Sequence, residues 1–270
     1  MIDRDSIHVW RVRLDAMAAL PAHERAARLE SWRAMLSAEE RRRAEAFLVL
    51  EHGQAYVAAH ALLRFVLGMY LGVLPASVDI GPSDGTKPTL AATASKGTND
   101  RDFVEKEWPD LRFNLSHTRG AVLIGIAIGR ELGVDIEWQR PIEDLEGMAR
   151  SVMSDGELLR WDALEPENRM RAFYHVWTRK ESYLKAIGLG LYRSLQDVTV
   201  PVSADALEDA QEDSRLVLDR SGMGMWSVLD VLAWAGYSAS VCWEGVELPS
   251  LVVRDLDVVR CDLTAIGELT

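Results

Sequence analysis

The chain has 270 residues, of which 48% are hydrophobic and 27% are charged. This composition excludes a disordered protein and is typical of a globular chain that buries a large core. The 42 acidic residues outnumber the 30 basic ones, giving a formal net charge of −12. That excess excludes a general binder of nucleic acids or anionic membranes, because such a protein needs a broad positive face.

Cysteine usage and the longest apolar segment indicate a cytoplasmic protein. The only cysteines are Cys242 and Cys261, too few for a disulfide framework or a cysteine-based zinc site. The N-terminus shows no signal-peptide pattern. The apolar run of residues 55–74 contains His60 and Arg64 and is too short to cross a bilayer, so we predict a core helix there.

The first half of the chain is predicted to contain a strand followed by helices. Residues 7–14 alternate apolar and polar side chains as a half-buried strand does. Ser37 and Glu40 form a capping-box signature for a helix that runs to about residue 51, and a second helix follows at about residues 54–71. The Gly-, Ser- and Thr-rich residues 82–110 are predicted to be a loop.

From residue 111 the pattern changes to strands, then helices, then strands again. Residues 111–116 alternate as a strand, and residues 121–128 and 132–138 are predicted to form a hairpin that turns at residues 129–131. Helices are expected at about residues 142–153, 155–164 and 167–186, with strands after residue 197. This order predicts an α+β protein with two comparable halves.

A weak internal repeat agrees with two halves. Ser37 is followed 27 residues later by Arg64 and then by Gly72, and Ser154 is followed 26 residues later by Lys180 and then by Gly188. Each segment begins with a helix-start signal and places a cation eight residues before a glycine at a helix end. Two such units predict a cleft between related halves.

Two pairs of charged residues could carry chemistry. On a strand, Asp135 and Glu137 point to one face, where two carboxylates can hold Mg²⁺ together with substrate phosphates. A solvated strand face is an equally good account of their spacing. Glu181 and Lys185 are neighbours on a helix, which by spacing alone favours a surface ion pair, although the aromatic residues around them indicate a buried helix.

A third candidate is the segment F-N-L-S-H at residues 113–117, which ends a strand with Ser116 and His117. Both side chains can bind phosphate, yet a lone histidine at a strand end is more often an ordinary hydrogen-bonded residue. No serine-hydrolase, phosphate-loop, dinucleotide-binding or histidine metal motif is present in the sequence.

The ordered set F-N-L-S-H (113–117), G-V-D-I-E (133–137) and W-T-R-K-E-S-Y-L-K (177–185) resembles the 4′-phosphopantetheinyl transferase superfamily. The length resembles the long, single-chain branch of the surfactin-synthetase activator type, which serves nonribosomal peptide, polyketide and related secondary-metabolite synthases. The resemblance implies a pseudo-dimer of two α+β halves with the active site in the cleft between them. We place the halves at residues 1–131, with the coenzyme A nucleotide contacts, and 132–270, with the metal site and the catalytic helix.

The activity implied by this resemblance is Mg²⁺-dependent transfer of the phosphopantetheine arm of coenzyme A to a serine of an apo acyl or peptidyl carrier protein, releasing 3′,5′-ADP. Glu181 and Lys185 would be catalytic, with Glu181 as the base. The resemblance also implies metal ligands and coenzyme contacts: Asp135, Glu137 and Glu181 for the metal, and Arg43, Lys87, Pro88, Ser116, His117 and Lys185 for coenzyme A.

The chain departs from the family pattern in two places. Thr86 stands where the family has the glycine of its G-K-P motif, and Glu40 stands where close relatives have a lysine. Arg43 could replace a second lysine that holds the 3′-phosphate, with Arg41, Arg42 and Arg64 as further candidates, although Arg64 could instead line the core. The carrier is expected to be acidic near its serine, so it should dock on a neutral or basic surface such as Arg41–Arg43 or Arg140.

The resemblance also implies a monomer with no nucleic-acid or membrane partner. Residues 201–270 carry a net charge of −9 and the first 200 residues only −3, so we expect the acidic segment to lie away from the coenzyme. Two alternatives remain at this point: a Mg²⁺-dependent pyrophosphate or nucleotide hydrolase, and an interaction protein that keeps the fold without catalysis.

Overall fold

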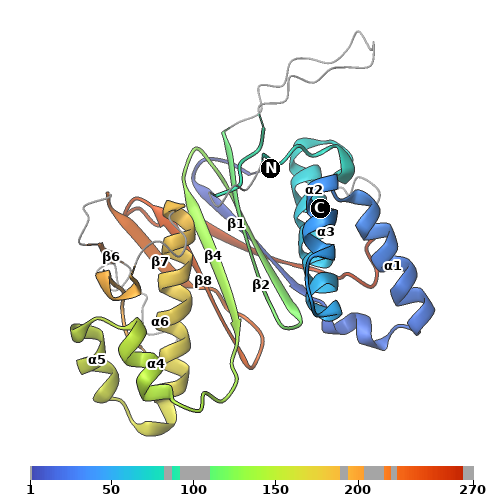
Figure 1. Ribbon diagram of the computed structural model, residues 1–270. Coiled ribbons are helices and arrows are strands. Elements are labelled where there is room, and N and C mark those ends of the chain that lie inside the picture. Colours follow the sequence, from blue (N-terminus) through green and yellow to red (C-terminus); the bar gives the residue numbers. More distant parts are fainter. Residues whose placement is uncertain are drawn as a thin grey trace.

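Two β-sheets lie side by side at the centre of the protein, which is seen here in a computed structural model (Figure 1). The structure describes residues 2–81, 87–91, 110–188, 194–203, 216–219 and 224–263. Most of the predicted loop at residues 82–110 therefore lies outside the described residues, as does about a third of the acidic segment 201–270.

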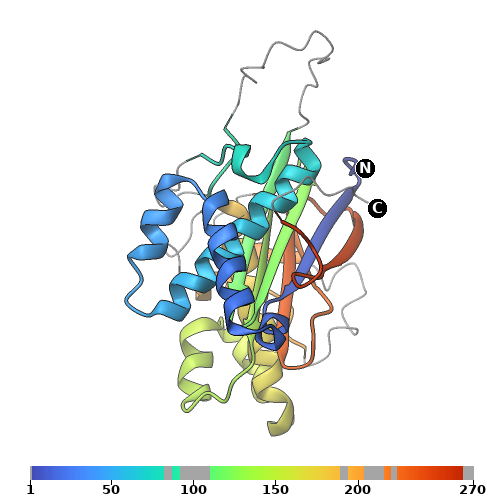
Figure 2. The ribbon, with the colours of Figure 1, turned by 90° about the vertical axis from the view of Figure 1, so that its right-hand side faces the viewer.

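The two sheets take their strands from different parts of the chain. The first has the strand order β2-β3-β1-β9 and the second has the order β4-β8-β7-β6-β5. Strands of the first sheet are β1 (Ser6–Arg13), β2 (Leu111–Thr118), β3 (Ala121–Ile128) and β9 (Ser250–Leu256); strands of the second are β4 (Leu132–Trp138), β5 (Val198–Thr199), β6 (Leu216–Asp219), β7 (Trp226–Asp230) and β8 (Tyr237–Glu244). The late strand β9 pairs in parallel with β1, so the end of the chain completes the sheet that the beginning started (Figure 2).

Helices cover the two outer sides of this pair of sheets (Figure 1). On one side lie α1 (Ala22–Met35), α2 (Ala38–Glu45) and α3 (Leu50–Leu71), and on the other lie α4 (Leu145–Val152), α5 (Asp155–Asp162) and α6 (Pro166–Ile187). Short 3₁₀ helices occur at Asp15–Ala19, Pro75–Ser77 and Leu195–Asp197. The order is therefore helices, sheet, sheet, helices.

Alternation along the strands explains these layers. In β1, Val9 packs in a core shared by both sheets, while its neighbour Trp10 packs against the layer of α1 and α3. In β4, Val134 and Ile136 enter the shared core, which turns Asp135 toward α6. A period of two thus buries both faces of each sheet and directs one carboxylate out of the shared core.

The mixed α+β class is confirmed, and one predicted pairing is wrong. Residues 121–128 and 132–138 are both strands, but β3 pairs with β2 and β1, whereas β4 pairs with β8. The hairpin instead joins β2 to β3 at residues 119–120, where Gly120 takes a φ of 71°. Glycine adopts this left-handed backbone conformation without steric penalty.

The predicted helix at residues 37–51 is also interrupted. α2 ends at Glu45, and α3 begins only at Leu50, so the second helix starts earlier than the predicted residue 54. The connecting residues expose Leu48 almost completely to solvent. The run of residues 55–74 does form a core helix, because most of its side chains within α3 are buried.

The first unit of the sequence repeat forms a buried ion pair. Ser37 and Glu40 make both hydrogen bonds of a capping box, and the Glu40 carboxylate lies 2.8 Å from the guanidinium of Arg64 on α3. Arg64 also donates to the carbonyl oxygen of Val78. α3 then ends at Gly72, which has a φ of 65°. Arg64 therefore lines the core, the second of the two roles considered for it.

The second unit repeats this arrangement with different residues. Ser154 and Glu157 form a capping box at the start of α5, and Glu157 pairs at 2.5 Å with Lys180 on α6. Both side chains are fully buried, and Lys180 also donates to the Val152 carbonyl oxygen. α6 ends at Gly188, with a φ of 72°. In each unit the capping-box glutamate binds the cation of the following long helix.

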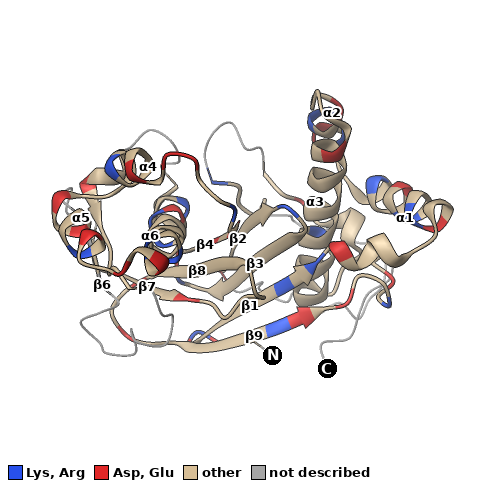
Figure 3. Ribbon diagram, turned by 90° about the horizontal axis from the view of Figure 1, so that it is seen from below, with Lys and Arg blue, Asp and Glu red and all other residues tan. Residues whose placement is uncertain are grey.

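Charges of both signs lie on the helices, while the strands are mostly uncharged (Figure 3). Within the described residues, no helix is both long enough and apolar enough to cross a membrane.

Candidate active site

In the described part of the chain, polar side chains of β2, and not its backbone, form hydrogen bonds to β4 and so join the first sheet to the second. Asn114, Ser116 and Thr118 on β2 accept hydrogen bonds from the backbone amides of Val134, Ile136 and Trp138 on β4, at 2.9, 3.3 and 3.3 Å. We call this row of three contacts the seam. Because both strands advance by two residues at each step, the seam places the end of the F-N-L-S-H segment beside the carboxylates of G-V-D-I-E.

Three of the predicted site residues meet directly at the seam. The Ser116 hydroxyl donates to Asp135 Oδ1 at 2.9 Å, and Lys185 Nζ donates to both, at 2.8 Å to Ser116 and 2.6 Å to Asp135. The Lys185 side chain remains 29% exposed, whereas that of Asp135 is 4% exposed. The partly exposed ammonium group of Lys185 thus contacts the buried carboxylate of Asp135 and the buried hydroxyl of Ser116.

Close contact between β4 and α6 brings Lys185 to this place. Gly133 faces α6, and a Cβ atom there would collide with the carbonyl oxygen of Ser182 and the amide of Ala186. Only glycine permits this approach. The glycine of G-V-D-I-E therefore has a packing role next to the carboxylates.

Carboxylates crowd one another around Asp135. Burial first and then the charge of Asp135 raise the pKa of Glu137 to about 7, against the lowering effect of a hydrogen bond from Thr118. Burial and Asp135 also raise the pKa of Glu181, against the lowering effect of Lys185. Repulsion of this kind disfavours ionisation of the group and is relieved by a bound cation.

His117 lies on the other face of β2, toward α3. Its side chain is accessible to solvent although many protein atoms surround it. This enclosure, followed by the nearby His60 and Lys185, lowers the pKa of His117 to about 4. His60 on α3 stacks on Tyr56 with ring centroids 3.9 Å apart. His117 therefore lies between His60 of α3 and Lys185 of α6.

The predicted coenzyme contacts Lys87, Pro88 and Arg43 lie in other surroundings. Lys87 Nζ pairs with Glu131 at 2.5 Å and donates to the carbonyl oxygen of Leu132, and burial lowers its pKa. Pro88 lies beside it and lines a pocket with the end of α6. Arg43 pairs with Glu39 on its own helix at 3.1 Å.

Two features around Asp135 bear on whether the site can hold a divalent cation. Asp135 Oδ2 is buried and has no hydrogen-bond partner among the described residues. Free carboxylate oxygens are the ligands that Mg²⁺ prefers. As the side chains stand, with Lys185 on Asp135 Oδ1, no group of three acidic, histidine or cysteine side chains within the described residues is close enough to hold a metal. The unpaired oxygen and the mutual repulsion of three carboxylates both indicate room for positive charge.

The sequence did not identify the seam itself. Asn114 belonged to a recognised segment without a role, and Thr118 lay one residue beyond it. Their alternation with Ser116 on one face of β2 is the signal that could have found both residues, but their partners are backbone amides, which no side-chain pattern reveals.

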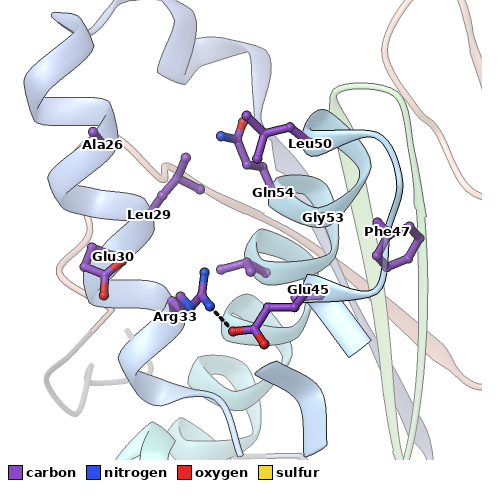
Figure 4. Close-up of a pocket in the computed structure, with 11 residues that line it drawn as sticks. Ala26, Leu29, Glu30, Arg33, Glu45, Phe47, Leu50, Gly53 and Gln54 are labelled. Atoms are coloured by element: carbon purple, nitrogen blue, oxygen red, sulfur yellow. Dashed lines mark hydrogen bonds and ion pairs between the residues drawn. The ribbon is translucent and has the colours of Figure 1, made fainter. Parts of the chain in front are cut away.

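A separate groove lies between α1 and α3 (Figure 4). Its walls include Leu29, Leu50 and Val57, and Arg33 crosses it to pair with Glu45. It contains none of the predicted catalytic, metal or coenzyme residues.

A family of known proteins matches the part of the chain that contains the carboxylates and Lys185. The family described as the 4′-phosphopantetheinyl transferase superfamily matches residues 131–242, which include β4 and α6. A 4′-phosphopantetheinyl transferase, HetI, of Nostoc sp. is 34% identical over 201 residues, covering 74% of this chain and 75% of the relative. A 4′-phosphopantetheinyl transferase of Bacillus subtilis is 27% identical over 172 residues, covering 64% of this chain and 69% of the relative.

Among solved structures, a holo-(acyl-carrier-protein) synthase from Bacillus anthracis, in complex with CoA (3′,5′-ADP), resembles 42% of this chain over 94% of its own, with 15% identity and a TM-score of 0.35. The relationship to HetI extends over about three quarters of both chains. It confirms the predictions of the family and of a transferase enzyme: the chain belongs to the 4′-phosphopantetheinyl transferase superfamily.

Proposed function

We propose that this protein transfers the phosphopantetheine arm of coenzyme A to a serine of an apo acyl or peptidyl carrier protein and releases 3′,5′-ADP. The observation that carries the proposal is the meeting of Ser116, Asp135 and Lys185 at one point, beside Glu137 and Glu181. All five belong to the three segments that mark the superfamily.

The reaction needs a proton acceptor and positive charge. The carrier serine attacks the β-phosphorus of coenzyme A, its oxygen forming a bond to phosphorus while the bond to the 3′,5′-ADP oxygen breaks. Glu181 accepts the serine proton as a general base. Lys185 offsets the charge that accumulates on the pyrophosphate oxygens, and Ser116 and His117 hold the phosphates.

Asp135, Glu137 and Glu181 would hold Mg²⁺, which neutralises pyrophosphate charge when bound. The unpaired Asp135 Oδ2 and the raised pKa values of Glu137 and Glu181 support this assignment. Lys87, Pro88 and Arg43 are proposed to contact the nucleotide end of the coenzyme.

We further propose two related halves, residues 1–131 and 132–270, with the active site between them and with β9 of the second half completing the sheet of the first. The two capping boxes, each paired with a cation of the following long helix, support this relation. The protein is proposed to be a cytoplasmic monomer that takes part in secondary-metabolite biosynthesis. Its carrier-protein substrates are proposed to dock near Arg41–Arg43 or Arg140.

Mass spectrometry of apo carrier proteins tests the proposal. Incubation with coenzyme A and Mg²⁺ should add one phosphopantetheine group to the serine of at least one carrier from a panel of acyl and peptidyl types. Omission of Mg²⁺ should abolish the addition. Failure on every carrier would contradict the proposal, and release of 3′,5′-ADP without any carrier would identify a hydrolase instead.

A further inference from the structure

Thr118 makes two contacts at the seam that mirror those of Ser116. Its Oγ1 donates to Glu137 Oε2 at 3.2 Å and accepts from the Trp138 amide at 3.3 Å. Ser116 in the same way donates to Asp135 and accepts from the Ile136 amide. Each hydroxyl thus accepts a hydrogen bond from a backbone amide of β4 and donates one to a carboxylate of β4, and the two sets of contacts are two residues apart.

This arrangement determines the direction of the Thr118 hydroxyl. A hydroxyl has a single proton, so acceptance from the fixed Trp138 amide leaves that proton for Glu137. Thr118 is β-branched, which restricts its side-chain rotation. The Glu137 oxygen that binds Thr118 is therefore held at a set place relative to β4.

The backbone at Thr118 is itself held on both sides of the hairpin. The guanidinium of Arg119 lies 4.5 Å from the ring centroid of Trp138, and the Tyr237 hydroxyl donates to the Arg119 carbonyl oxygen at 2.9 Å. β2 ends at Thr118, so these contacts fasten the end of the strand to both β4 and β8. Such support around a ligand-bearing group fixes its orientation.

We propose that Thr118 is a positioning residue that orients the Glu137 carboxylate for divalent-cation binding. The proposal rests on the proposed function, since it assigns Glu137 to the cation. Thr118 acts only through Glu137: no contact of Thr118 with a substrate is required. Asn114 also accepts a hydrogen bond from a β4 amide, but none of its described contacts is to a carboxylate. A substitution of Asn114 therefore tests the joining of the two sheets separately from the positioning of a carboxylate.

Thr118→Val keeps the shape of the side chain and removes both hydrogen bonds. We expect Mn²⁺ binding in the presence of 3′,5′-ADP, measured from free Mn²⁺ by electron paramagnetic resonance, to weaken about 10–100-fold, as is usual when a partner of a metal ligand is lost. Thr118→Ser should restore binding close to that of the unchanged protein. In a Glu137→Gln background, Thr118→Val should weaken Mn²⁺ binding no further.

Asn114→Leu is the matched control because it breaks one seam hydrogen bond of the same kind. It should lower the thermal unfolding temperature, as Thr118→Val does, while leaving Mn²⁺ affinity unchanged. Should Thr118→Val fail to fold, Thr118→Ala carries the same expectation. Unchanged Mn²⁺ affinity on loss of the hydroxyl, or an equal loss in Asn114→Leu, would overturn the proposal.

The unchanged protein distinguishes this proposal from the one on which it rests. If it binds Mn²⁺ and modifies a carrier, a null effect of Thr118→Val overturns only the role of Thr118. If it neither binds Mn²⁺ nor modifies any carrier, the proposed function fails and the role of Thr118 fails with it.

Discussion

Glu181 carries the most specific chemical assignment at the scale of single residues. It lies on α6 one turn before Lys185, and burial together with Asp135 raises its pKa. A base needs a carboxylate, whereas binding of the coenzyme phosphates depends mainly on Lys185, Ser116 and His117. The two steps should therefore separate on mutation.

Glu181→Gln should lower the rate of carrier modification by about 10²–10⁴-fold, the usual contribution of a general base. Binding of 3′,5′-ADP, measured by calorimetry without a divalent cation, should change little. Glu167→Gln is the matched control, because it makes the same substitution at an exposed position of the same helix. Normal turnover in Glu181→Gln would remove this residue from the base role.

The family resemblance selected the side chains of the candidate site, but no pattern in the sequence indicated what holds them in place. Ser116, Asp135 and Lys185 were each chosen from the sequence, and they meet within hydrogen-bond distance. Thr118 was missed because its importance depends on a backbone amide of another strand. The pairing of Lys87 with Glu131 was also missed, since neither residue's pattern points to the other.

Buried ion pairs fasten one helix to another at the scale of elements. Glu157 and Lys180 have no solvent exposure, and Lys180 is also hydrogen-bonded to backbone carbonyl oxygens of Val152 and Leu195. Removing one partner leaves the other charge buried without compensation. We therefore expect this buried ion pair to contribute more to the stability of the fold than the ion pairs on the surface do.

Lys180→Met should lower the free energy of unfolding by about 3–5 kcal/mol, as measured by urea denaturation, because Glu157 loses its countercharge. The exposed pair Glu146–Arg150 on α4 provides the comparison. Glu146→Gln should cost less than about 1 kcal/mol. Equal effects of the two substitutions would show that burial of the Glu157–Lys180 pair does not govern its contribution.

The ion pair between Glu40 on α2 and Arg64 on α3 is expected to be sensitive to acid. Burial alone would raise its pKa, but hydrogen bonds from His60 and the Ser37 amide, together with Arg64, outweigh burial and lower the pKa to about 2. A lowered carboxyl pKa stabilises the fold above the unfolded-state value near 4.5, and the stabilisation is lost as the pH falls toward 2.

Between pH 5 and pH 2, we therefore expect Glu40 to account for about 3 kcal/mol of lost unfolding free energy. Glu40→Gln should flatten this part of the stability profile, measured by chemical denaturation at each pH. Glu39→Gln, at an exposed neighbouring position, should leave the profile unchanged. A profile of Glu40→Gln that falls as steeply as the original would contradict the assignment.

Alternation predicted the strands more accurately than their partners. The segments at residues 121–128 and 132–138 are strands, but β4 pairs with β8, which lies far along the chain. Apolar side chains on both faces of β3 tell only that it is buried. Partner choice comes from packing of distant segments, which local periodicity does not contain.

At the scale of the whole molecule, the C-terminal strand β9 completes the first sheet. β9 pairs with β1, and the residues after it bury Val258 and Leu263 against the layer of α1 and α3. Arg28 on α1 donates to the carbonyl oxygens of Val258 and Val259. The sequence predicted two consecutive halves, but no pattern in it showed that the last strand returns to the first sheet.

A chain ending at residue 249 should therefore lose most of its stability. Burial of Leu256, Val258 and Leu263 contributes about 1.5–3 kcal/mol for each side chain, which together approaches the net stability of a typical domain. We expect no cooperative thermal transition by circular dichroism. A transition at the original temperature would show that the first sheet does not require β9.

We propose that β2, β4 and α6 together form the catalytic site of a phosphopantetheinyl transferase. The most direct test is a crystal structure with coenzyme A and Mn²⁺, in which anomalous scattering locates the cation. We predict an anomalous peak bound by Asp135, Glu137 and Glu181, with the coenzyme pyrophosphate next to Lys185. A cation or coenzyme bound elsewhere, for example in the groove between α1 and α3, would contradict the account.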